Sequence, residues 1–194
     1  MARFISEFGD AAVLIPSSAL VLIYLLSLRA PRPALLWAST LALCAAVTLA
    51  LKIGFHACGA QLPLLDIRSP SGHASLSATF YGSCAVMAAG DKGGWTRRAA
   101  LTAGAALVLA VAASRVYLHL HTVSEVVTGL AVGVACVTWF GWRYRAQPAV
   151  PRSWAAAIVA VGVFTLALHG SHFYLEGAII RAAEMFRVDL LVCG

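Results

Sequence analysis

One polar stretch, Ser69-Pro70-Ser71-Gly72-His73, stands at the start of a long apolar run. Proline favours the first turn of a helix, serine is a common N-cap residue, and glycine lets the backbone approach a ligand closely. Such a helix start presents backbone N–H groups without intrahelical partners, and these favour an anion. The histidine can gain or lose a proton near neutral pH. The stretch therefore predicts an anion site with a proton donor beside it.

A second stretch, Ser114-Arg115 followed by His121 and Glu125, precedes another apolar run. His121 and Glu125 are four residues apart at the start of an expected helix, so they share a face. A carboxylate held against one imidazole nitrogen fixes the tautomer and makes the ring more basic. The other nitrogen is then free to attack phosphorus, and His73 can protonate the departing oxygen.

Fixed cations lie near the same ends of the apolar runs, where they complement the helix start. Together they form an anion site of the size of a phosphate, and they stabilise the charge that spreads over phosphoryl oxygens in the transition state. This chemistry requires no metal ion or other cofactor. The candidate phosphate ligands are Lys52, Arg68, Ser71, Gly72 and Arg115.

Two other interpretations of these residues remain open. Lys52 and Arg115 also fit a purely structural role, in which a basic side chain at a helix end extends to the membrane surface. His119, His121 and Glu125 form a possible metal-ligand set, although no third well-spaced group of ligands accompanies them.

The composition is that of an integral membrane protein. Of the 194 residues, 61% are hydrophobic and only 11% are charged, and the mean hydropathy is +0.85. A soluble domain would carry roughly 25% charged residues. The net charge of +6 comes from basic residues spread between the apolar runs, as membrane topology requires. We therefore expect membrane lipids and no nucleic acid as partners.

The apolar runs predict an all-α, polytopic membrane helix bundle of about six transmembrane helices, forming a single domain over residues 1–194. The first run does not resemble a signal peptide, because the residues before it are not basic and no cleavage pattern follows it. Gly129 and Gly133 are spaced for close helix packing. Residues 171–191 carry several charges and predict an interfacial helix. The expected spans are 11–28, 34–53, 71–89, 99–117, 121–141 and 153–169.

The distribution of Lys and Arg predicts the orientation. The turns at one end of the expected spans hold eight such residues and those at the other end hold six, three of which are the candidate phosphate ligands. By the positive-inside rule, the first end is cytoplasmic, as in a bacterial inner membrane. The candidate site and both termini then lie on the outer, periplasmic or extracellular face. There Cys58 and Cys193 are candidates for a disulfide.

The order of these motifs resembles the type 2 phosphatidic acid phosphatase family, which also includes vanadium haloperoxidases and bacterial acid phosphatases. The family pattern is Lys-x6-Arg-Pro, then Pro-Ser-Gly-His, then Ser-Arg-x5-His-x3-Asp. The resemblance covers about residues 50–130. It implies that His121 forms a phosphohistidine, that Glu125 orients it and that His73 is the general acid. It assigns phosphate binding to Lys52, Arg115, Ser71 and the Gly72 amide.

The sequence departs from that pattern at two positions. Gly59-Ala60 stands where the family has Arg-Pro, and Arg68 is the candidate replacement cation. Glu125 stands where the family has Asp, which keeps the carboxylate and adds one methylene group.

Together these observations predict a metal-independent phosphatase that removes a terminal phosphate from a membrane lipid. A site at the membrane surface, with little soluble chain around it, favours a lipid phosphate as substrate. The resemblance suggests phosphatidate, phosphatidylglycerol phosphate, a polyprenyl diphosphate or the phosphates of lipid A. The alternatives are a lipid-to-lipid phosphotransferase that uses the same site, and a non-catalytic lipid-binding or transport relative. The sequence predicts no particular protein partner.

Overall fold

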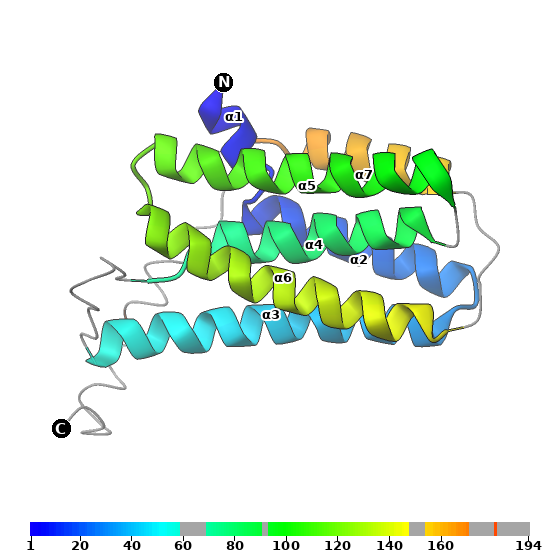
Figure 1. Ribbon diagram of the computed structural model, residues 1–194, viewed down its shortest axis with the longest axis horizontal. Coiled ribbons are helices and arrows are strands. Elements are labelled where there is room, and N and C mark those ends of the chain that lie inside the picture. The colour runs from blue at the N-terminus through cyan, green and yellow to red at the C-terminus, as the bar shows by residue number, and fades with distance from the viewer. Residues whose placement is uncertain (59–68, 91–92, 148–153, 171–180, 182–194) are drawn as a thin grey trace.

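A computed structural model describes residues 1–58, 69–90, 93–147, 154–170 and 181 (Figure 1). Within these residues all regular secondary structure is helical, which confirms the predicted all-α class. The helices are α1 (Ala2–Glu7), α2 (Ala11–Ser27), α3 (Pro31–Cys58), α4 (Gly72–Ala89), α5 (Gly94–Tyr117), α6 (Val123–Arg145) and α7 (Trp154–Ala167).

The helices identify the chain as a membrane protein. By length and composition, three described helices can cross a bilayer, over Pro31–Phe55, Gly94–Tyr117 and Val123–Arg145. Helix α2 is apolar but shorter. The figure of about six spans stays a prediction. The interfacial helix expected over 171–191 and the disulfide between Cys58 and Cys193 lie outside the described part of the chain, apart from Arg181 and the backbone of Cys58.

Helix α4 lies at the centre of the bundle, in contact with α2, α3, α5 and α6 (Figure 1). Its small residues, such as Ala74, Ser75 and Ala78, are buried and allow neighbouring helices to approach closely. A Cβ added to Gly133 of α6 would lie only 2.7 Å from the Ser75 carbonyl oxygen. A Cβ on Gly129 would collide with the carbonyl oxygen of Ser71. The predicted glycine packing surface is therefore confirmed.

Two boundaries differ from the sequence expectation. The sequence pattern predicts no helix before residue 11, whereas residues Ala2–Glu7 form α1. The second expected span begins at residue 34, after Pro33, but α3 already begins at Pro31. Proline lacks only an N–H group that the first turn of a helix leaves unpaired, so both prolines fit inside the helix.

The end of the bundle opposite α1 contains an aromatic core. Trp37 packs edge-to-face on Phe80 with 5.5 Å between ring centroids, and Phe140 stacks on Tyr144 at 5.3 Å. Trp37 also donates a hydrogen bond from Nε1 to the Ser18 carbonyl oxygen at 3.1 Å. Trp37 also packs edge-to-face on Phe140 of α6, with 6.3 Å between ring centroids. These contacts connect α2, α3, α4 and α6, and so fix the helices whose other ends carry the candidate site residues.

Candidate active site

The predicted site residues lie at one end of the bundle. Helices α3 and α5 end there and α4 and α6 begin there, beside the N-terminal helix α1 (Figure 1). The structure thus brings together the end of α3, the start of α4, the end of α5 and the start of α6, which carry the described candidate residues. Arg68, and the Gly59-Ala60 pair that departs from the family pattern, lie outside the described residues.

The turn between α5 and α6 places His121. The Leu120 N–H donates to the Arg115 carbonyl oxygen at 3.1 Å, and the His119 N–H donates to that of Val116 at 2.9 Å. This is the Schellman pattern that ends many helices, in which one residue adopts a left-handed backbone. His119 fills that position with φ of 56° and is exposed. Its neighbour His121 is thereby turned back toward the start of α6.

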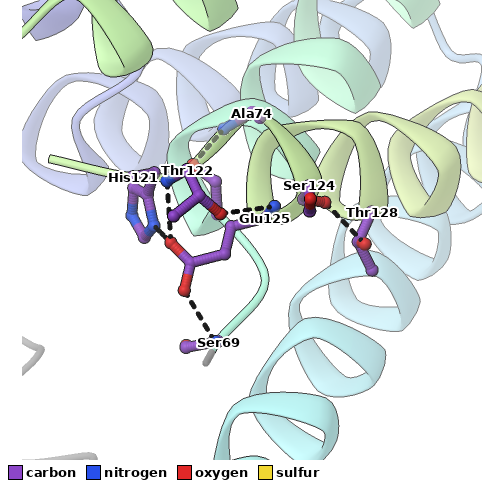
Figure 2. Close-up of polar contacts among 8 residues, drawn as sticks. Ser69, Ala74, His121, Thr122, Ser124, Glu125 and Thr128 are labelled. Carbon is purple, nitrogen blue, oxygen red and sulfur yellow. Dashed lines mark hydrogen bonds and ion pairs between the residues drawn. The ribbon is translucent and has the colours of Figure 1, made fainter. Parts of the chain in front are cut away.

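His121 forms a close pair with Glu125. The distance from Nδ1 of His121 to Oε2 of Glu125 is 2.8 Å, and their side chains are 12% and 7% exposed (Figure 2). With the proton on Nδ1, the imidazole donates to the carboxylate and its Nε2 carries the lone pair. The predicted i, i+4 pair is therefore formed, with the geometry of an oriented nucleophile.

Glu125 makes four further hydrogen bonds, two through its carboxylate and two through its backbone. Its Oε2 accepts from the Thr122 N–H at 3.2 Å, while Thr122 Oγ1 accepts from the Glu125 N–H at 3.3 Å, which completes a capping box. Its Oε1 accepts from the Ser69 N–H at 2.9 Å (Figure 2). The Glu125 carbonyl oxygen also accepts from the Ser71 N–H at 3.0 Å. One residue therefore joins His121 to the residues that precede α4.

The start of α4 is organised as the sequence predicts. Ser71 is the N-cap residue, fully buried, and its Oγ accepts from the Ala74 N–H at 3.4 Å. A hydroxyl that accepts in this way retains its own O–H as a donor. Beside it, Cε of Lys52 lies 3.6 Å from the place that a Cβ on Gly72 would occupy. The Lys52 side chain is thus packed against the helix start, and the residue is only 4% exposed.

The charges of Arg115 and Lys52 act on both His73 and His121. Arg115 and Lys52 each repel a positive charge on His73 and on His121. Burial is the main cause that lowers the pKa of His121 below its ordinary value. The repulsion from Arg115 and Lys52 adds to it, and the hydrogen bond to Glu125 opposes it. His121 is therefore held in the neutral form that a nucleophile requires.

Residues 31–149 match the PAP2 superfamily. The chain belongs to the PAP2 superfamily. This membership supports a phosphatase-type function. A curated relative from Klebsiella pneumoniae, described as an uncharacterized 22.5 kDa protein in the cps region, is 32% identical over 171 residues. That similarity covers 86% of this chain and 82% of the relative. No solved structure matches the chain at a comparable level.

The PAP2 match leaves out residues 1–30, yet this part of the chain reaches the site. Arg115 donates from Nη1 to Ser6 Oγ at 3.0 Å, and Asp10 Oδ2 lies 3.7 Å from Nε2 of His73. The sequence interpretation missed both contacts. Asp10 before an apolar run is a recognisable N-cap signal, but no spacing in the sequence relates it to His73.

The capping box is a second feature that the sequence interpretation missed, although Thr122-x-x-Glu125 is a recognisable signature. It gives Glu125 of this PAP2 chain a structural role at N3 that suits glutamate. As for the metal-ligand alternative, no three His, Cys, Asp or Glu side chains gather as a possible metal site within the described residues.

Proposed function

We propose that the protein is a lipid phosphate phosphatase that works through a phosphohistidine on His121 and needs no metal ion. The observation that carries the proposal is the His121–Glu125 pair. Nδ1 of His121 lies 2.8 Å from Oε2 of Glu125, and this leaves Nε2 for attack on phosphorus. Two cations and a helix start lie beside it, where they suit a bound phosphate.

In the first step of the proposed reaction, His121 Nε2 attacks phosphorus while the bond from phosphorus to the ester oxygen breaks. His73 gives a proton to that oxygen, and a lipid alcohol leaves. Glu125 accepts a hydrogen bond from Nδ1–H of His121, so the proton stays on Nδ1. The carboxylate also offsets the positive charge of the phosphorylated ring. Lys52 and Arg115 stabilise the charge on the phosphoryl oxygens.

In the second step, water attacks phosphorus and the nitrogen–phosphorus bond breaks. His73 takes the proton from water, and inorganic phosphate leaves. Both histidines then return to their starting protonation states. The substrate class that we propose is a lipid phosphate monoester or diphosphate, because the three helices long and apolar enough to cross a bilayer begin or end at the candidate site. Phosphatidate, phosphatidylglycerol phosphate, polyprenyl diphosphate and lipid A phosphates are the members to compare.

Phosphate release from these lipids in detergent micelles tests the proposal. The parent enzyme is expected to turn over at least one of them in the presence of a chelator. His121→Ala is expected to be inactive, whereas His119→Asn should keep its activity, because the His119 side chain is exposed and asparagine tolerates its left-handed backbone. Activity abolished by the chelator would contradict the metal-independent mechanism.

The same assay separates the alternatives. Labelled phosphate that appears in a second lipid instead of in solution would identify a phosphotransferase. Lipid binding without turnover, unchanged in His121→Ala, would identify a non-catalytic relative. Replacement of Arg68 by methionine tests whether this residue supplies the cation that the Lys-x6-Arg-Pro pattern would have supplied; a rise in KM with a folded protein would support that role.

We further propose that the site faces the outer side of a bacterial inner membrane, because the opposite ends of the helices carry the basic residues Arg97, Arg98, Arg143 and Arg145. A cysteine introduced at Leu120 should react with a membrane-impermeant thiol reagent in spheroplasts, and one at Arg97 should not. The reverse pattern would reverse the orientation.

A further inference from the structure

The segment before α2 lies outside the family match but packs directly on the site. Gly9 is the closest point of contact. A Cβ added there would lie 2.8 Å from Cγ1 of Val111 and 3.2 Å from Cβ of His73. The absence of a side chain at Gly9 therefore lets the backbone before Asp10 approach the helix start that carries His73.

Several contacts fix this segment in place. The Tyr81 hydroxyl of α4 donates to the Phe8 carbonyl oxygen at 2.9 Å. His169, after α7, forms an ion pair with Glu7 at 2.7 Å, and its ring lies 4.0 Å from that of Phe4. Helix α1 is thus joined to α4 and to the end of α7, so the position of Asp10 beside the site is defined by packing on two sides.

Asp10 uses its two oxygens for different partners. Oδ1 accepts from the Ala12 N–H at 2.8 Å, which caps α2. Oδ2 lies 3.7 Å from Nε2 of His73. That separation is within the range of an ion pair and longer than a hydrogen bond. The side chains of His73 and Asp10 are 27% and 12% exposed, so the pair is partly buried and solvent screens it less than a surface pair.

We propose that Asp10 is a positioning residue that holds His73 as the general acid of the reaction. The proposal rests on the phosphatase function proposed above. In it, the His73 imidazolium points Nε2–H toward Asp10 and donates its Nδ1 proton to the departing ester oxygen. The site would then contain two histidine–carboxylate pairs, one for the nucleophile and one for the acid.

The charges around His73 explain why an acid partner is needed. Arg115 of α5 and Lys52 of α3 both act against a proton on His73, and burial does the same. Among the described residues whose charges act on this ring, Asp10 favours the protonated form. Burial and the two cations outweigh the carboxylate, so the pKa of His73 stays below its ordinary value. Asp10 keeps that pKa from falling further, and so raises the share of the protonated form that the first step uses.

Leaving groups of different basicity test this role. Asp10→Asn removes the charge but keeps a residue that caps helices well, and Asp10→Ser keeps the cap with a side chain too short to reach His73. Both variants are expected to lose about 10- to 100-fold in kcat/KM, which reports the first phosphoryl transfer, on an alkyl phosphate that needs a general acid. On 4-nitrophenyl phosphate, whose leaving group needs little protonation, they should lose less than about threefold. Glu7→Gln is the matched control, because this carboxylate pairs with His169 and should leave the ratio of the two rates unchanged.

A pH measurement on His73 itself gives a second readout. Diethylpyrocarbonate modifies neutral imidazole, and the modification at His73 can be followed against pH by mass spectrometry. Asp10→Asn should shift the midpoint of this modification to lower pH, because the protonated ring has lost its carboxylate partner. Glu7→Gln should not shift it.

The outcomes separate the two proposals. No turnover by the parent enzyme on any phosphate ester would overturn the proposed function and, with it, the general-acid role. The role of Asp10 alone would be overturned by a different result. In that case the parent enzyme turns over both esters, Asp10→Asn loses activity equally on both, and the pH midpoint of His73 modification does not move. Such a result would reduce Asp10 to the cap of α2.

Discussion

Both histidines of the site face a carboxylate, but the two pairs are built differently. His121 and Glu125 come from one short stretch, and the α6 capping box holds them 2.8 Å apart. His73 and Asp10 come from helices far apart in the sequence, and their 3.7 Å separation depends on how α1 and α2 pack against α4. The first pair is fixed by local backbone geometry, whereas the second is fixed by tertiary packing.

This difference has an energetic consequence. A pair within one helical turn forms whenever the helix forms, so its geometry needs few other contacts. A pair between helices changes whenever either helix shifts. We therefore expect substitutions at Glu125 to act on chemistry directly, and those in the N-terminal segment to act through the position or the charge of their partners.

Glu125→Gln is expected to have the largest effect in this comparison. The amide keeps the size of the side chain but removes the charge that offsets the phosphorylated His121, and it can present an N–H to Nδ1 and so favour the wrong tautomer. We expect kcat to fall by about 10³-fold or more. Equal thermal stability of the purified variant would show that the loss is chemical. A loss below about tenfold would contradict the role of Glu125 in orienting the nucleophile.

Glu125→Asp keeps the charge and restores the family residue, so it isolates the reach of the side chain. A carboxylate shorter by one methylene cannot hold His121, the Thr122 N–H and the Ser69 N–H together as Glu125 does. We expect a loss of about tenfold in kcat/KM and a lower melting temperature, because a buried backbone N–H loses its acceptor. Unchanged activity and stability would mean that the backbone readily adapts to the shorter carboxylate.

The dependence of activity on pH tests both pairs at once. Burial, with Arg115 and Lys52, lowers the pKa of His121, and the neutral ring is the proposed nucleophile. The acid limb of the profile should therefore lie below about 6.5, the ordinary pKa of histidine, because neutral His121 persists down to that lower pH. Glu125 raises the pKa of His121, so Glu125→Gln should move this acid limb to still lower pH.

For the same profile, Asp10→Asn should leave the acid limb in place and move the basic limb to lower pH, because His73 then loses its proton more easily. Two substrates whose phosphates ionise at different pH control for titration of the substrate. An acid limb above about 6.5 on both would contradict the assignment of His121 as a buried, neutral nucleophile.

The contrast between the pairs also explains what the sequence could predict. The i, i+4 spacing of His121 and Glu125, the Ser71 cap and the glycines of α6 are local patterns, and the structure contains each of them. The burial of Lys52 could not be predicted, because a lysine at the end of an apolar helix fits a surface position equally well. Only the packing of α3 against the start of α4 brings it beside Gly72.

The N-terminal contacts were beyond prediction for a related reason. Ser6 and Asp10 belong to a short, mixed segment whose one recognisable signal, the N-cap residue Asp10, does not point to the site, and α1 has only six residues. So short a helix has little stability of its own. It forms here because Phe4, Glu7 and Phe8 have partners on α4 and after α7. Such partners are tertiary contacts, which no periodicity in residues 1–10 reveals.

The smallest expected effect concerns Ser6, the second contact of this segment with the site. Its Oγ accepts from Nη1 of Arg115 at 3.0 Å, and a hydrogen bond from a charged donor orients the guanidinium without adding charge. Ser6→Ala should raise KM by about two- to fivefold, leave kcat nearly unchanged and leave the pH limbs where they are, since no titrating group is altered. Ser6→Thr, which keeps the hydroxyl, is the matched control and should restore KM. A large fall in kcat in Ser6→Ala would mean that Arg115 stabilises the transition state only when this contact is intact, and the N-terminal segment would then be as much a part of the catalytic geometry as α6.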